Sequence, residues 1–303
     1  MALTDTRPRP TEPPRPLEAA TRRRDTASVV FLGVLWACLL LAALFLLFVL
    51  STIVVSGLSR FDVNLFTGAP STIRPQTAGV LPAIVGTLIV VGVTALIALP
   101  LGVAAAVYLE EYADPARWFN RAIELNVQNL AAVPSVIFGI LVLAFVVRSP
   151  LNFGAVAVSG SIALALLILP VVIIATRESL RAVPREIRDG SLAVGATQWQ
   201  TVWRQLLPAA VPGIATGSIL AISRAVGEAA PLILVGATTF ITFTPDGLFS
   251  RYTVMPVQIF NFAIQSREAF IPLTYASILL LIIILLALNG AAIILRNKFQ
   301  RRW

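Results

Sequence analysis

Long stretches without a charged residue constrain the fold of this chain more than any other feature of its sequence. Helical residues rise about 1.5 Å each, so roughly 20 of them cross an apolar layer about 30 Å thick. Intervals of at least this length separate charged residues at 25–60, 74–110, 124–148, 148–177 and 268–296. A sixth candidate, 208–237, is interrupted only by Arg224 and Glu228. The sequence therefore predicts an all-α integral membrane protein with six transmembrane helices.

The charges that remain are distributed unevenly along the chain. Only 13% of the residues are charged, against about 25% in soluble domains. Most Arg and Lys residues lie in the N-terminal tail, near residues 117–121, within 177–204 and after 296. Cytoplasmic segments of membrane proteins retain basic residues, so both termini are predicted to be cytoplasmic. This distribution and the attraction of anionic lipid account for the net charge of +8, and we expect no nucleic-acid partner.

The N-terminal segment differs in composition from the rest of the chain. Its proline-rich sequence, among Thr, Arg and Glu, contains too little apolar surface to fold. The domain prediction is a disordered cytoplasmic tail over 1–27 and a six-helix transmembrane domain over 28–303. Within that domain, the third span, at about 122–147, contains Pro134 and Gly139. A kinked packing helix is the favoured interpretation there, and a direct ligand site is the alternative.

Several classes of chemistry are excluded by the residues that the chain lacks. There is no His, and the single cysteine, Cys38, lies in the first span. A disulfide, a Cys/His metal site and a Cys/His or Ser/His/Asp catalytic group are therefore excluded within this chain. The only lysine is Lys298, so a Gly-rich phosphate-binding loop ending in Lys-Ser/Thr cannot form. We expect no cofactor in this chain and no ATP hydrolysis by it.

The predicted cytoplasmic segment 177–207 does not have the composition of a linker. Its part PREIRDGSLAVGATQWQTVWRQLLP, 184–208, predicts two short amphipathic helices on either side of a turn at Gly195. Trp199 and Trp203 recur at helical spacing with several aliphatic residues. Such a surface requires cover from lipid headgroups, from neighbouring helices or from a partner protein.

The same segment resembles the signature loop of ABC importer permeases. That loop has Glu-Ala-Ala, three residues, Gly, nine residues and then Ile-x-Leu-Pro; here the Gly and the Leu-Pro match in register, whereas Glu-Ala-Ala and Ile depart. The resemblance implies a coupling helix that fits a groove of a separate ATPase. The residues that it assigns to ATPase coupling are Asp189, Gly190, Ser191, Gly195, Ala196, Trp199, Leu207 and Pro208.

Flanking segments narrow the resemblance. YLEEYAD (108–114), VPSVIFG (133–139), the residues 195–217 and SRAVGEAAPL (223–232) together look like the A-type permease subunit of the bacterial phosphate-specific transport (Pst) system, over roughly 79–296. The resemblance implies the type I ABC importer permease fold in the bacterial plasma membrane. It also implies a homologous C-type permease, an ATPase dimer that holds ATP and magnesium, and an extracytoplasmic phosphate-binding protein.

Arg224 and Glu228 are charged residues inside an otherwise apolar span. Their i, i+4 spacing places them within reach of one another on a helix. An unpartnered Arg in the middle of a span costs about 2.5–3.5 kcal/mol on insertion scales. A structural pair that pins the span to a neighbour is one interpretation. Gly227 and Pro231 favour the other, in which Arg224 binds the anion during translocation and Glu228 neutralises Arg224 when the path is empty.

Alternative functions remain at this point. Another oxyanion, such as phosphonate, sulfate or molybdate, suits the same two charges. A secondary transporter, a channel and a membrane enzyme are less favoured, because the sequence shows the coupling loop, no evident inverted repeat and no catalytic cluster. The aromatic outer loop 238–270 is interpreted as a membrane-interface belt, or as a docking site for a binding protein.

Overall fold

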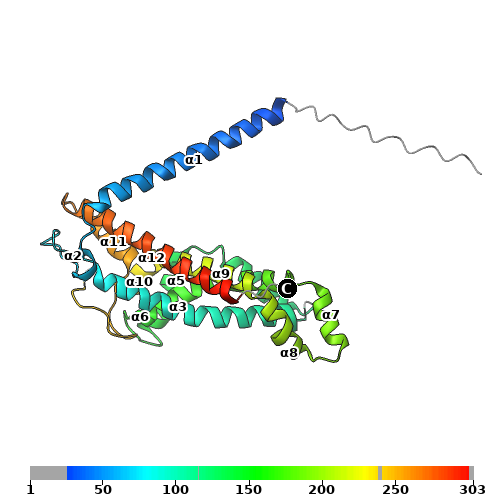
Figure 1. Cartoon of the computed structure of the whole chain (residues 1–303). Helices are drawn as coiled ribbons and strands as arrows, with labels where there is room; N and C mark the ends of the chain where they lie inside the picture. Colours follow the sequence, from blue (N-terminus) through cyan, green and yellow to red (C-terminus); the bar gives the residue numbers. More distant parts are fainter. Residues whose placement is uncertain (1–25, 115, 238–240, 300–303) are drawn as a thin grey trace, which may run out of the picture. The chain divides into compact units, whose positions relative to one another are not determined.

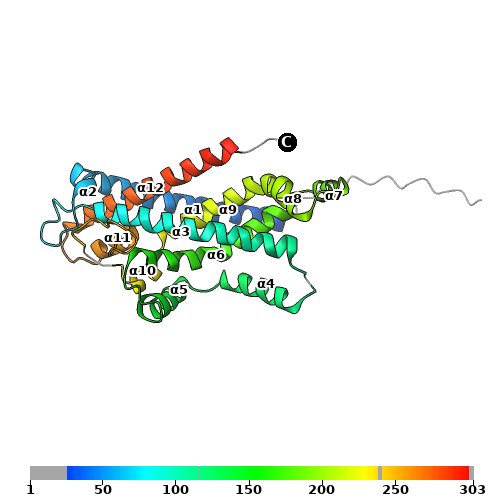
Figure 2. The same cartoon turned by 90° about the horizontal axis from the view of Figure 1, so that it is seen from below.

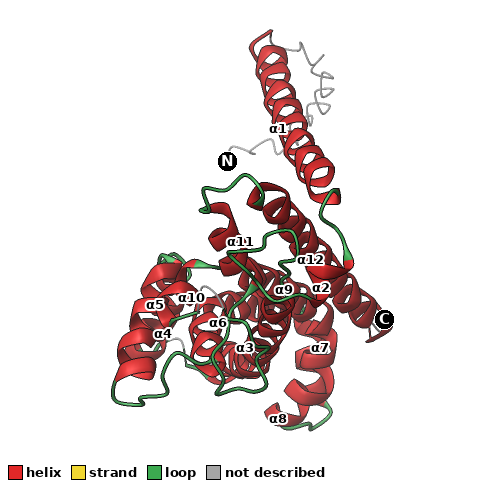
Figure 3. Cartoon of the chain, turned by 90° about the vertical axis from the view of Figure 1, so that its left-hand side faces the viewer, coloured by secondary structure: helices red, strands yellow, loops and turns green. Residues whose placement is uncertain are grey.

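The structure is a computed structural model that describes residues 26–114, 116–237 and 241–299. These residues form helices, turns and loops, with no strand among them (Figure 3). The predicted all-α class is therefore confirmed. The predicted disordered tail, 1–27, lies almost entirely outside the described residues, and so does the start of the aromatic outer loop, at 238–240.

The helices that are long and apolar enough to cross a membrane agree with the predicted spans. Among the described residues there are five of them, or up to six if one strongly bent pair of helices is a single span. The five are Ser28–Leu58, Leu81–Tyr112, Ala157–Arg181, Gln198–Gly227 and Phe270–Lys298. The side of the membrane on which the termini lie stays a prediction.

Helix α1 (Thr26–Leu58) divides between two compact units, Met1–Ser51 and Thr52–Trp303. In the first unit its large apolar side chains, among them Trp36, Leu41 and Phe45, are exposed around the whole helix. A helix that is apolar on every side belongs in lipid or in a protein core. This part of the chain is therefore suited to a hydrocarbon environment.

The core of the second unit is formed by α3 (Leu81–Val107), α6 (Ala157–Arg181) and α9 (Leu207–Gly227), of which α6 contacts both others. Figure 2 shows α3 and α6 side by side. Small residues permit this close packing: a Cβ added at Gly102 would lie 2.6 Å from Val172, and one at Gly217 would lie 2.3 Å from Ala175. Membrane helices commonly associate through such small residues.

The third predicted span is broken rather than kinked. Helix α4 (Trp118–Leu130) and the helix formed by α5 (Ser135–Val142) and the π-helical turn η2 (Leu143–Arg148) meet at 109°. Pro134 precedes α5 with an extended backbone, ψ 134°. A proline disfavours the helical conformation of the residue before it and donates no hydrogen bond. The prediction of one kinked helix over 122–147 therefore understated this break.

A second break divides the predicted span 208–237. Helix α9 ends at Gly227, Glu228 has an extended backbone, and α10 (Ala230–Val235) is a separate short helix. Pro231 has no N–H to donate to the Gly227 carbonyl and would clash with it in a continuous helix. At its other end the helical run starts earlier than predicted, with α8 (Gln198–Thr201) and the π-helical turn η3 (Val202–Leu206). A single helix over 208–237 is thus wrong at both ends.

The two broken segments pack against each other. Helices α5 and α10 are in contact, and a Cβ at Gly139 of α5 would lie 2.7 Å from the Cα of Pro231. Val133 and Ala229, which lie in the two breaks, both pack on the core cluster that includes residues of α3, α6 and α9. The breaks therefore belong to one packed region of the bundle.

The two ends of this bundle carry different elements. Helices α2 (Val63–Thr67) and α11 (Met255–Ala263) lie at one end, whereas α7 (Arg185–Ala193) and α8 lie at the other (Figure 1). Asp62 caps α2, and Arg60 pairs with Asp62 while donating to the carbonyls of Pro75 and Ala78. The long helix α12 (Phe270–Phe299) packs on α9 and α11.

Candidate functional site

The segment between α6 and α9 forms the two helices that its sequence predicts. Helix α7 ends before Gly195, whose φ of +87° suits glycine, and α8 follows. Thr197 and Gln200 form a capping box at the start of α8, in which the Gln200 N–H donates to Thr197 Oγ1 at 3.3 Å and the Thr197 N–H donates to Gln200 Oε1 at 2.9 Å. The second helix continues directly into α9 and is not a separate element.

This segment, which we call the coupling loop (Arg185–Leu206: α7, the turn at Gly195, α8 and η3), presents apolar side chains to the outside. Trp199 and Trp203 are 60% and 53% exposed, and their ring centroids are 5.2 Å apart. Val194 in the turn is 85% exposed, and Ile187 and Leu192 of α7 are also exposed. Exposed apolar groups of this kind mark contact surfaces.

The structure separates the predicted coupling residues by environment. Asp189 and Gly190 are exposed on α7, whereas Ser191 is partly buried and exchanges a 2.9 Å hydrogen bond with Thr201. The Ala196 N–H donates to the Ser191 carbonyl at 3.2 Å, which closes the turn. At the far end, Leu207 packs on a buried cluster of Leu180, Val202, Leu206 and Ala210, and the exposed Pro208 occupies the first turn of α9.

Acidic residues that sequence reasoning did not single out pair with arginines of the coupling loop and of α6. They are Glu110 and Glu111 of the π-helical turn η1 (Tyr108–Tyr112), which follows α3. Glu111 pairs with Arg188 of α7, and Glu110 pairs with Arg177 and Arg181 of α6. The sequence signal for these ion pairs is that two adjacent glutamates follow the second span, whereas several arginines follow the fourth.

Arg224 and Glu228 are paired in the structure. Arg224 Nε lies 3.5 Å from Glu228 Oε1, and the two side chains are 44% and 20% exposed. The sequence predicts that both residues lie on one face of a continuous helix. Glu228 instead lies in the break after α9, so only Arg224 is on the helix. An arginine with almost half of its side chain accessible beside a helix break can reach a ligand without disrupting the packed core.

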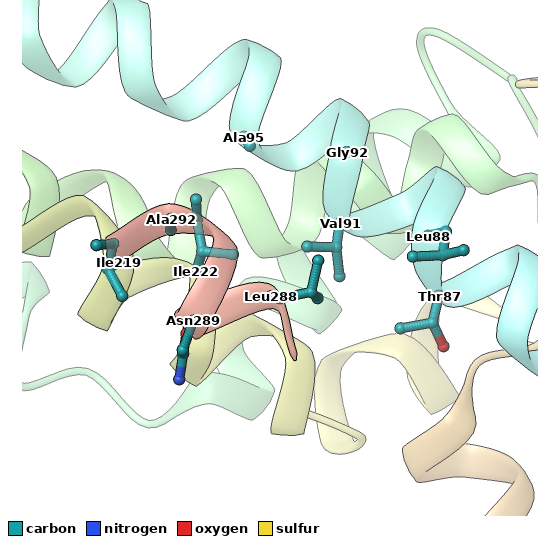
Figure 4. Close-up of a pocket in the computed structure, with 10 residues that line it drawn as sticks. All are labelled: Thr87, Leu88, Val91, Gly92, Ala95, Ile219, Ile222, Leu288, Asn289 and Ala292. Carbon is teal, nitrogen blue, oxygen red and sulfur yellow. The ribbon is translucent and has the colours of Figure 1, made fainter. Parts of the chain in front are cut away.

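The neighbouring residue fixes the turn of α9 that carries Arg224. Ser223 Oγ donates a 2.6 Å hydrogen bond to Asn289 Oδ1 of α12. Asn289 also lines a pocket of about 260 Å³ between α3, α9 and α12 (Figure 4). The other lining residues are almost all apolar, among them Val91, Ile222 and Leu288. This pocket does not suit a free anion and is distinct from the Arg224 site.

The donor groups available among the described residues also limit the cofactors. No group of three or more His, Cys, Asp or Glu residues that could hold a metal ion occurs in this part of the chain. The expectation of no cofactor in this chain stays a prediction.

Comparison with known proteins places these features in a family. The model of the family described as "Binding-protein-dependent transport system inner membrane component" matches residues 98–303, which include the coupling loop and both breaks. The chain belongs to this family. It is a permease subunit and a multi-pass inner-membrane protein.

Individual relatives agree with this placement. The permease is 38% identical over 225 residues to phosphate transport system permease protein PstA 1 of Mycobacterium tuberculosis, which covers 74% of this chain and 72% of that protein. It is 32% identical to phosphate transport system permease protein PstA of Haemophilus influenzae, with 92% of this chain and 96% of that protein covered. The resemblance to A-type permeases is thus confirmed.

Solved structures confirm the fold. A bacterial ABC transporter involved in the import of the acidic polysaccharide alginate has a chain with a TM-score of 0.64 and 17% identity, covering 89% of this permease and 96% of that chain. At this identity the likeness concerns the fold alone. The predicted ABC importer permease fold is therefore correct.

Proposed function

We propose that this permease is the A-type subunit of an ATP-driven importer of inorganic phosphate. The relatives of Mycobacterium tuberculosis and Haemophilus influenzae, both named phosphate transport permeases, support the substrate. The observation that carries the proposal within the chain is Arg224, a half-exposed cation at a break in a membrane helix. Ionisable residues inside membrane spans commonly mark substrate or ion pathways.

In this proposal Arg224 binds phosphate and Glu228 controls its release. A guanidinium donates two parallel hydrogen bonds to phosphate oxygens, which gives both charge and orientation. When no anion is present, Glu228 neutralises Arg224 and lowers the cost of the charge in the membrane. A carboxylate can also accept a hydrogen bond from the P–OH group of a partly protonated phosphate, which fully ionised sulfate lacks. Competition between Glu228 and phosphate for Arg224 keeps binding weak enough for release.

The complex around this subunit follows from the same proposal. A homologous C-type permease completes the translocation path, and an extracytoplasmic phosphate-binding protein delivers the anion. An ATPase dimer with ATP and magnesium docks on the coupling loop, whose exposed Trp199 and Trp203 offer the apolar contact. The coupling loop then lies on the cytoplasmic side, in agreement with the basic residues that surround it.

The experiment is phosphate uptake into proteoliposomes that contain the complete complex. We expect Arg224→Gln to lower uptake by about tenfold or more, because it removes charge-assisted hydrogen bonds to the anion. Arg148→Gln, at an exposed arginine outside both the coupling loop and the break after α9, is the matched control and should leave uptake unchanged. Full uptake by an assembled Arg224→Gln complex would show that the pair is structural. Uptake of sulfate or molybdate in place of phosphate by the wild-type complex would overturn the substrate.

A further inference from the structure

Glu111 contacts both helices of the coupling loop. Its side chain is only 4% exposed and pairs with Arg188 of α7. Its backbone carbonyl accepts a hydrogen bond from the side chain of Gln198, the first residue of α8. A single residue at the end of α3 thus holds two elements that lie on opposite sides of the Gly195 turn.

The preceding residue, Glu110, makes a second set of contacts. Its carboxylate accepts from Arg177 Nε at 3.1 Å and from Arg181 Nε at 2.9 Å, both on α6. Arg177 Nη2 in turn donates to Glu124 Oε1 of α4 at 2.9 Å. The Arg177 side chain is only 9% exposed, so it depends on these carboxylates to compensate its charge.

The geometry of η1 makes these two sets of contacts possible. Successive residues of a helix point in different directions around its axis, so the two neighbouring glutamates face different partners. Glu110 faces α6 and α4, where it lines a polar hollow of about 180 Å³, while Glu111 faces the coupling loop. The turn closes with the Ala113 N–H donating to the Tyr108 carbonyl at 2.8 Å. The segment is therefore a junction of four elements: α3, α4, α6 and α7.

The junction connects the coupling loop with the broken spans. Helix α4 begins at Trp118 and leads directly to the break before Ser135, and α5 beyond that break packs on α10 at Pro231. A continuous series of contacts thus extends from Arg188 to the region that contains Glu228. Chains of packed side chains and ion pairs of this kind carry energetic coupling between distant sites.

We propose that Glu111 is a positioning residue that transmits movement of the coupling loop to α3 and α4. The inference rests on the proposed function, because it assumes that an ATPase moves the loop. The Glu111–Arg188 pair makes the loop and η1 move together, and the ion pairs from Glu110 through Arg177 to Glu124 pass this movement to α4. A loop that docked an ATPase without this link would move without displacing the broken spans.

The first test compares transport with ATP hydrolysis in the complete complex in proteoliposomes. We expect the complex with Glu111→Gln to keep its ATPase subunit bound and to continue to hydrolyse ATP. The amount of phosphate transported per ATP should fall about tenfold, within the usual range for coupling between linked sites. Arg188→Glu should act likewise, and combination with Glu111→Arg should restore part of the ratio. Glu178→Gln is the control, since Glu178 is 65% exposed and contacts only Arg181 among these residues. An unchanged ratio in Glu111→Gln, or a parallel loss of both activities, would overturn the proposal.

A second measurement does not depend on the transported anion. With Cys38 replaced by Ser, spin labels at Val194 in the coupling loop and Trp118 at the start of α4, both strongly exposed, report the distance between these elements. We expect ATP to displace the two labels as a unit, leaving their distance unchanged, and Glu111→Gln to introduce an ATP-dependent change. If the wild-type complex carries another anion, the substrate proposal fails while this result stands. An ATP-dependent change already present in the wild type, or none in the variant, would refute the link.

Discussion

Ser223 donates a hydrogen bond of 2.6 Å to Asn289, and this contact joins α9 to α12 one residue before Arg224. Both residues lie in helices that are otherwise apolar, where few alternative partners exist. The bond therefore fixes the rotation of α9 about its axis at the turn that carries Arg224.

Asn289→Leu removes this bond while keeping a side chain of similar size. Interhelical hydrogen bonds in membranes contribute about 0.6–2 kcal/mol, so we expect a small decrease in the melting temperature of the purified complex. Because Arg224 loses its orientation, the KM for phosphate uptake should rise. Leu288→Ala, in the same pocket, is the control and should not affect the KM for phosphate. An Asn289→Leu complex with an unchanged KM would show that the bond only supports packing.

Gly139 determines how closely the two broken segments approach. A Cβ at this position would lie 2.7 Å from the Cα of Pro231 and 2.9 Å from its carbonyl oxygen, and neither backbone atom can move independently. We expect Gly139→Ala to destabilise the permease by about 1–3 kcal/mol, as overpacking does elsewhere. Gly92→Ala is the matched control, because that helical glycine has open space around it. Thermal unfolding followed by tryptophan fluorescence measures both; equal melting temperatures would show that α5 and α10 are loosely packed.

The positions of the spans could be predicted from the sequence because the length of an apolar helix is set by the bilayer. Pro134 and Pro231 likewise indicated irregular backbone. Their effect was underestimated, since the angle after a proline depends on what the next segment packs against, and Gly139 meets Pro231 only in three dimensions. The pairing of Arg224 with Glu228 followed from their spacing, although a helix break rather than a helical face brings them together.

The attachment of the coupling loop could not be predicted in this way. Glu111 and Arg188 lie 77 positions apart, and one sequence does not reveal which of its charges meet. In the sequence the two glutamates stand out only as part of a family resemblance. Their contacts depend on the fold, which brings the C-terminal ends of α3 and α6 together with α7.

Gly195 is needed at the turn between α7 and α8. Its φ of +87° lies in the left-handed region, where a side chain costs roughly 1–2 kcal/mol. We expect Gly195→Ala to distort the turn and to reduce the amount of ATPase that co-purifies with the permease. Gly92→Ala, within α3 and outside the coupling loop, has no atom near its added Cβ; it should leave the ATPase content unchanged and favour the helix slightly. Equal ATPase content in both variants would argue against a specific loop conformation in docking.

Trp199 and Trp203 test whether the coupling loop binds a partner through its apolar face. Both rings are more than half exposed, so their removal costs the isolated permease little packing. Aromatic residues at the centre of an interface commonly contribute about 2 kcal/mol or more to binding. We expect Trp199→Ala to leave the melting temperature of the permease unchanged and to raise the Kd for the ATPase about 30-fold, measured by microscale thermophoresis of the purified subunits. Trp36→Ala, at an exposed tryptophan of α1, provides a control for the general loss of an aromatic ring and should not alter this Kd. Unchanged ATPase binding by Trp199→Ala would instead assign this face to the membrane interface, because an amphipathic helix with exposed tryptophans is equally suited to lipid headgroups.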